Sequence, residues 1–109
     1  MIEEHDFKKY GDEALAALQR ELVLAADDYG FQTSLRGGAI TITFARPPAK
    51  FVIGLDIATR QIKVAFATRS YRLDWDIVEN GFVQTETRQT LKELVEQAIS
   101  KHLKQDVEL

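Results

Sequence analysis

The sequence contains no cysteine, which excludes disulfide bonds, thiolate metal sites and thiol catalysis. It has no apolar run near the roughly 20 residues that cross a bilayer, and its acidic start, MIEEHDF, lacks the cationic and apolar segments of a secretory signal. Phosphate-binding glycine loops, nucleophile–base pairs and spaced sets of histidines are missing too. We therefore expect a cytoplasmic protein without a membrane segment and without catalysis by its side chains.

The residues that are present are typical of one globular domain. The chain has 109 residues, of which 45% are hydrophobic and 28% are charged. A chain of this length buries enough surface to form one core without disulfides or a structural metal. We expect a single domain over residues 1–109 and a monomer.

Acidic residues concentrate at the start of the chain, whose formal net charge is −3. Residues 1–30 contain eight acidic and three basic residues. Such a segment argues against nucleic-acid binding and is compatible with cations or a basic protein partner; a solvated helix face explains it equally well. In the middle of the chain we predict a loose basic cluster that would attract an acidic partner. Its members are Arg60, Lys63, Arg69 and Arg72.

Hydrophobic periodicity predicts a helix at each end of the chain. Residues 3–28 place apolar side chains at every third or fourth position. Within this helix Gly11 is expected where the backbone lies close to a sheet, and Gly30 is expected to end it. The last helix begins near Thr90, which has the spacing of a capping box with Glu93.

Between the helices, alternating apolar and polar residues predict strands joined by short hairpin links. The strands are expected near residues 31–35, 39–44, 50–55, 60–67, 70–75 and 82–85. Because each strand has one apolar face, the sheet should be covered on one side only. Both helices have one apolar stripe and must pack on that side. The predicted fold class is a two-layer α/β sandwich, an antiparallel sheet with the N- and C-terminal helices on one face.

Several segments resemble the frataxin family, and the resemblance extends over nearly the whole chain. The segments are GGAITITF, FVIGLDIATRQIKVA, YRLDWD and GFVQTETRQTLKELVEQAI. The resemblance implies an α-β-α sandwich, in agreement with the periodicity. It also implies weak binding of ferrous iron by an acidic ridge. It further implies contact with a cysteine desulfurase and its iron–sulfur scaffold, made through that ridge and the open sheet face.

The family's acidic ridge is reduced in this sequence. Carboxylate oxygens suit hard cations, and clustered negative charge raises the local cation concentration. Val23 and Leu24 occupy positions where family members commonly have acids, and the predicted first strand, FQTSL, has none. We predict weaker iron binding than is usual for the family, through the acids that remain. These predicted metal contacts are Asp12, Glu13, Glu21, Asp27 and Asp28.

The open sheet face retains only part of the family pattern. A family glutamine is kept as Gln61, whereas the exposed tryptophan is replaced by Lys63, which cannot supply the same apolar contact. Small residues keep the face flat: Thr41, Thr43, Gly54, Ala65 and Ala67. The predicted partner contacts are Thr41, Thr43, Gln61 and Lys63. The alternative is a wet sheet face whose lysine prevents aggregation.

Three other features have simple explanations. Asp74 and Asp76 could hold a metal or act as acid and base, but no partner is evident nearby and solvated turn charges are the better interpretation. His102 lies alone at the margin of an apolar stripe, which favours packing over metal binding. Trp75 shares a strand face with apolar residues and is expected in the core.

Two functions remain open after these observations. The first is a frataxin-like accessory protein that docks on a desulfurase–scaffold complex and presents weakly bound ferrous iron. The second is a structural or interaction module, such as an accessory subunit of a larger complex, that has lost iron binding. A ferroxidase is the weakest candidate, because it would need the acids that this chain lacks.

Overall fold

The structure is a computed structural model that describes residues 2–45, 48–66 and 69–109. These residues form two helices and six strands in the predicted order. Their bounds are α1 Glu4–Tyr29, β1 Phe31–Arg36, β2 Ala39–Ala45, β3 Pro48–Asp56, β4 Gln61–Phe66, β5 Arg69–Asp76, β6 Gly81–Gln84 and α2 Leu91–Leu103.

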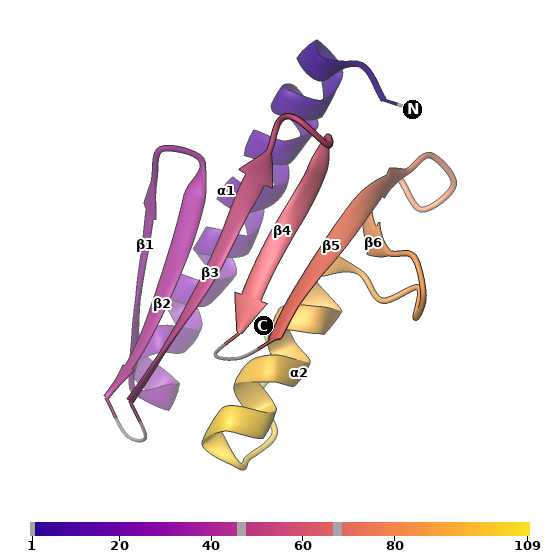
Figure 1. The fold of residues 1–109 in the computed structure, drawn as a ribbon. Coiled ribbons are helices and arrows are strands. Elements are labelled where there is room, and N and C mark those ends of the chain that lie inside the picture. The colour runs from indigo at the N-terminus through magenta and orange to yellow at the C-terminus, as the bar shows by residue number, and fades with distance from the viewer. Residues whose placement is uncertain (1, 46–47, 67–68) are drawn as a thin grey trace.

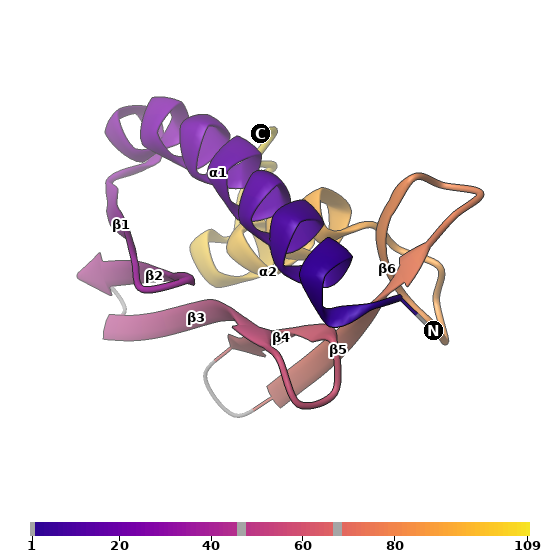
Figure 2. The ribbon, with the colours of Figure 1, turned by 90° about the horizontal axis from the view of Figure 1, so that it is seen from above.

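The strands form one antiparallel sheet in which neighbours follow the sequence order from β1 to β6. Figure 1 looks onto this sheet with both helices behind it, and the view from above in Figure 2 places α1 and α2 on the same side. In the described ranges, the other face of the sheet carries no helix. The predicted two-layer sandwich is therefore confirmed.

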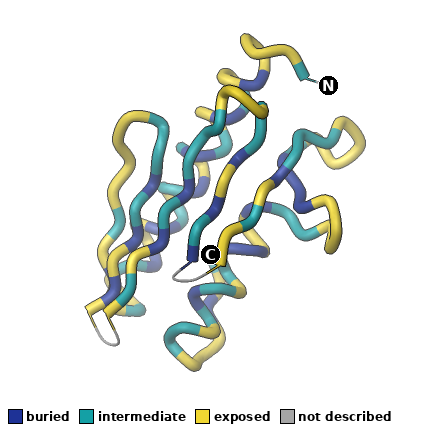
Figure 3. Tube along the Cα trace, in the orientation of Figure 1, coloured by how far each residue is buried: buried dark blue, intermediate teal, exposed yellow. Residues whose placement is uncertain are grey.

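The core lies between the sheet and the helices. Every second residue of the central strands points into it, which Figure 3 shows as dark-blue segments along the strands. Ile42 of β2, Ile53 of β3 and Val64 of β4 have no exposed surface. The helices complete the core with Phe7, Leu15, Leu18, Leu22, Leu94, Val95 and Ile99.

Helix α1 lies close to the sheet at Gly11, as predicted. A Cβ atom on Gly11 would lie 2.6 Å from Cδ2 of Leu55 on β3, which is far inside van der Waals contact. The helix ends at Gly30, which adopts a left-handed φ of 75° and donates its N–H to the carbonyl of Ala26 at 2.8 Å.

Trp75 of β5 packs on the helix side of the sheet. Its ring stacks on Tyr10 of α1, with centroids 4.5 Å apart and planes 10° apart. Phe82 of β6 meets it edge to face at 5.3 Å. Trp75 therefore joins α1 to the sheet rather than facing a partner, although it remains half-buried.

Helix α2 begins with the predicted capping box. The hydroxyl of Thr90 accepts the N–H of Glu93 at 3.2 Å, and the Glu93 carboxylate accepts the N–H of Thr90 at 3.1 Å. After the helix, Val107 is 3% exposed, and its N–H donates to the Ser100 hydroxyl at 3.0 Å. The tail is thus packed against α2.

Candidate functional site

The open face of the sheet presents side chains in rows that run across the strands. Residues directly opposite each other in an antiparallel pair point to the same side. One row contains Ser34, Thr41, Val52, Ala65 and Ser70, and the next contains Arg36, Ala39, Gly54, Lys63 and Arg72. Thr43 lies in a third row, between Gln32 and Lys50. The predicted small residues therefore lie together on one face, except Ala67, which falls outside the described residues.

Lys63 projects from the middle of β4 and is exposed. Gly54 lies opposite on β3, so no side chain crowds the lysine there. On β5 the opposite residue is Arg72, and like charges in this position are unfavourable. Arg72 instead forms an ion pair with Asp56 at 2.9 Å. Within the described residues, Lys63 has no acidic side chain at ion-pair distance.

Gln61, a predicted partner contact, is committed to bonds within the sheet. Its Nε2 donates to Asp74 at 3.0 Å, and its Oε1 accepts from Arg72 at 3.2 Å. Arg72 also donates to Asp56, and this hydrogen bond, aided by the backbone N–H of Thr59, holds the pKa of Asp56 below its ordinary value. Gln61 therefore helps to fix Arg72, whereas Lys63, like Arg36 and Lys50 on the same face, forms no ion pair with an acid of the described residues.

The predicted basic cluster on the central strands is not a single cluster. Lys63 and Arg72 point to the open face, whereas Arg69 has the same strand parity as Tyr71 and lines a hollow on the helix side. Arg60 lies in the turn between β3 and β4. The prediction was wrong because successive strand residues point to opposite faces, so closeness in sequence did not mean one surface.

The five predicted metal contacts all lie on α1 and are spread along it. Asp12 and Asp28 are sixteen residues apart, which at the helical rise is about 24 Å. Asp12 and Glu13 are sequence neighbours and do not face each other, and the same holds for Asp27 and Asp28. Four of the five are exposed, and Glu21 is half-buried.

No three acidic or histidine side chains among the described residues come close enough to share a metal ion. The acids of α1 can raise the local concentration of cations along the helix, but they do not form a ready-made coordination shell. The assignment of Asp12, Glu13, Glu21, Asp27 and Asp28 to metal binding stays a prediction.

Asp74 and Asp76 have the partners that the sequence did not reveal. Asp74 accepts from Gln61 and, at 2.8 Å, from the hydroxyl of Thr85. Asp76 accepts the N–H of Glu79 at 3.1 Å and pairs with Arg88 at 2.7 Å. These bonds hold the pKa of Asp76 below its ordinary value.

Asp76 therefore fixes the turn between β5 and β6, and Asp74 links β5 to β4 and to Thr85 after β6, so both carboxylates have partners that the interpretation as solvated turn charges did not include. His102 packs against the Phe44 ring, with centroids 4.4 Å apart, in line with the packing role expected for it.

Within the residues that the structure describes, neither helix has the combination of length and apolar character that crossing a bilayer requires.

Comparison with known proteins agrees with the fold. A family model for the frataxin-like domain matches residues 1–105. No curated protein gives a significant match. Among solved structures, the frataxin from Psychromonas ingrahamii, studied within the CyaY protein family, matches with a TM-score of 0.83 over 98% of this chain and 97% of that chain. Its sequence identity of 15% limits that likeness to the fold. The family model, in contrast, covers nearly the whole sequence, and the chain belongs to the frataxin-like domain family.

Proposed function

We propose that this protein is an accessory factor of iron handling that docks on a cysteine desulfurase–scaffold complex through its open sheet face. The observation that carries the proposal is Lys63, an exposed cation without an acidic partner among the described residues, which lies beside a row of small side chains on the open face. A flat face of this kind can approach another protein closely, and Lys63 would meet an acidic patch on it.

The chemistry of this contact differs from that of an aromatic anchor. Lysine is depleted at interface cores because its ammonium group is strongly hydrated. Charged groups at an interface contribute more to orientation and association rate than to affinity. The docking that we propose is therefore sensitive to salt and weaker than one built on a buried tryptophan.

Ferrous iron would be carried as cargo along α1. Acids spread over about 24 Å attract cations without enclosing one. Binding should therefore be weak and readily reversible, as suits a protein that passes iron on. The wide spacing of these acids is equally compatible with the second candidate, an interaction module without iron binding. An experiment must therefore separate the two functions.

The docking is tested with Lys63→Glu and the desulfurase–scaffold complex of the same organism. Reversing the charge should weaken binding at least tenfold, since like charges placed against each other cost on the order of 1.4 kcal/mol or more. Lys92→Glu is the matched control, because Lys92 is an exposed lysine of α2 on the other side of the sheet. Calorimetry on the three proteins gives the affinities. Equal losses for both variants, or no binding by the unmodified protein, would refute the docking.

Iron handling is tested separately by anaerobic titration with ferrous iron, followed by amide NMR. Line broadening confined to residues 12–28 supports iron carriage along α1. The paired variants Asp12→Asn with Glu13→Gln, and Asp27→Asn with Asp28→Asn, show which end of the helix contributes more. Unchanged spectra at millimolar iron would remove the iron role and leave the interaction module.

A further inference from the structure

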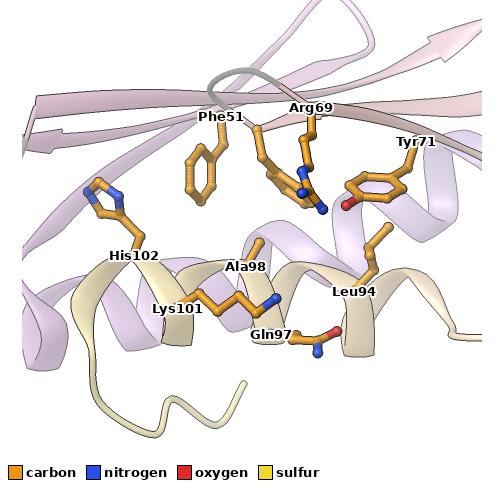
Figure 4. A pocket seen from close by; sticks show the side chains of 9 residues that line it. Phe51, Arg69, Tyr71, Leu94, Gln97, Ala98, Lys101 and His102 are labelled. Carbon is orange, nitrogen blue, oxygen red and sulfur yellow. The ribbon is translucent and has the colours of Figure 1, made fainter.

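A groove opens on the helix side of the sheet, between strands β3–β5 and helix α2 (Figure 4). Its volume is about 290 Å³. Phe51, Phe66 and Tyr71 form the sheet wall, and Leu94 and Ala98 form the helix wall. Since Lys63 projects from the opposite face, the groove is separate from the proposed docking surface.

The sheet wall of the groove is aromatic. The rings of Phe51 and Phe66 meet edge to face, with centroids 4.9 Å apart. The centroids of Phe66 and Tyr71 are 5.8 Å apart. Phe51 and Phe66 are buried beneath the groove, whereas Tyr71 is half-buried and borders it. Such a row of rings offers edges and faces to a planar apolar group.

Two cations border the same groove. Arg69 hangs from β5 toward α2, and the side chain of Lys101 extends along α2 on the facing side (Figure 4). Both residues are exposed, and within the described ranges neither side chain has an ion-pair or hydrogen-bond partner. Glu96, an acid of α2 nearby in sequence, is occupied by the backbone N–H of Leu109 at 2.9 Å. The groove therefore combines an apolar wall with two positive charges that form no ion pair with a carboxylate of the described residues.

We propose that this groove binds a small aromatic carboxylate, with its ring against Phe66 and Tyr71 and its carboxylate between Arg69 and Lys101. The planar guanidinium group of Arg69 suits the two oxygens of a carboxylate, and Lys101 adds a mobile second donor. Most small-molecule sites share this design, in which a few polar groups orient a ligand on a mainly apolar surface. The inference does not depend on the proposed docking or on iron.

The proposal is tested by NMR titration of the full chain with 1-naphthoate as the probe. A ligand of about 13 heavy atoms should bind with a dissociation constant of about 1 mM. Amide shifts should concentrate at Phe66, Arg69, Tyr71, Ala98 and Lys101. The neutral analogue 1-naphthamide should bind about tenfold more weakly, because it lacks the charge-assisted bonds.

Two variants and a matched control decide whether the cations act as proposed. Arg69→Gln and Lys101→Gln should each weaken 1-naphthoate binding about three- to tenfold. Lys92→Gln, on the same helix but bordering a different hollow beside Glu21, should leave it unchanged. All three positions are exposed, so the variants should keep the fold, which their spectra verify.

Several results would overturn the proposal. These are unchanged spectra at about 10 mM probe, equal binding of the acid and the amide, or equal effects of Lys92→Gln and Arg69→Gln. Tighter binding of octanoate than of 1-naphthoate would refute the aromatic specificity. Any of these outcomes would leave the test of Lys63 unaffected, because that residue faces the other side of the sheet.

Discussion

The contact between Gly11 and Leu55 allows a quantitative test of how α1 is seated on the sheet. In Gly11→Ala the new Cβ would lie 2.6 Å from Cδ2, 3.3 Å from Cδ1 and 3.5 Å from Cγ of Leu55. Carbon atoms in contact normally lie 3.5–4.0 Å apart, so the methyl group overlaps the branched end of the Leu55 side chain, which is half-buried against the core. Leu55 must move or the helix must lift.

Two opposing terms set the expected change in stability. Alanine is favoured over glycine inside a helix by about 0.8–1.0 kcal/mol, whereas overpacking costs about 1–3 kcal/mol. Gly11→Ala should therefore lower the free energy of unfolding by about 1 kcal/mol. Leu55→Ala alone should cost about 2 kcal/mol, near the lower end for such changes because Leu55 is only partly buried.

The combination of the two changes isolates the contact. With Leu55 shortened, Gly11→Ala should become stabilising by about 1 kcal/mol, which gives a coupling of about 2 kcal/mol between the sites. Urea unfolding followed by circular dichroism measures each term, and Ala17→Gly, at an exposed position of α1, calibrates the helix propensity. If Gly11→Ala stabilised the unmodified protein by the full propensity term, the close approach would not constrain the helix and the reasoning would fail.

Three further changes test other parts of the structure. Thr90→Ala removes the capping oxygen of α2 and should lower the free energy of unfolding in urea by about 1 kcal/mol. Val107→Ala should lower the free energy of unfolding by about 2 kcal/mol in the same assay, because it removes two methyl groups from a residue that is 3% exposed. An unchanged free energy of unfolding would mean that the tail is not part of the core. The backbone N–H of Glu79 and the Arg88 guanidinium keep the pKa of Asp76 below 3.8, so the stabilisation is complete above that pH and disappears as the pH falls through the lowered value. Asp76→Asn should therefore destabilise the protein most at pH 7, with a loss that shrinks as the pH falls below 3.8, and a loss independent of pH would contradict the assigned bonds.

The fold could be predicted from the sequence because its signals are local. Alternation in AITITF places Ile40, Ile42 and Phe44 on one face regardless of what surrounds the strand, and the spacing of Thr90 and Glu93 defines a helix start. Because the strands have apolar residues on one face only, both helices must pack on that face of the sheet. These steps use only neighbours in sequence and the rule that apolar faces must be covered.

The candidate site was harder to predict because its contacts join distant residues. Arg88 reaches Asp76 from a left-handed backbone conformation with φ of 63°, and nothing in the sequence indicates that conformation. The pairing of Arg72 with Asp56 joins β5 to the end of β3 across β4. The position of Arg69 could have been predicted from the sequence. It lies two residues before Tyr71 on the same strand, so both side chains point to the helix side of the sheet.

The two proposed roles of the protein converge at one edge of the sheet. Helix α1 lies on the covered side of the sheet (Figure 2), so most of its acids are remote from a partner docked on the open face. Asp27 is different, because it borders a hollow together with Gln32 and Thr43, whose side chains belong to the open face. A partner seated over Thr43 would therefore reach Asp27 around β1, the edge strand, before it reached Asp12 at the other end of the helix. If iron passes from this protein to a docked scaffold, it should leave from the C-terminal end of α1, and loss of the Asp27 carboxylate should slow transfer more than loss of the Asp12 carboxylate.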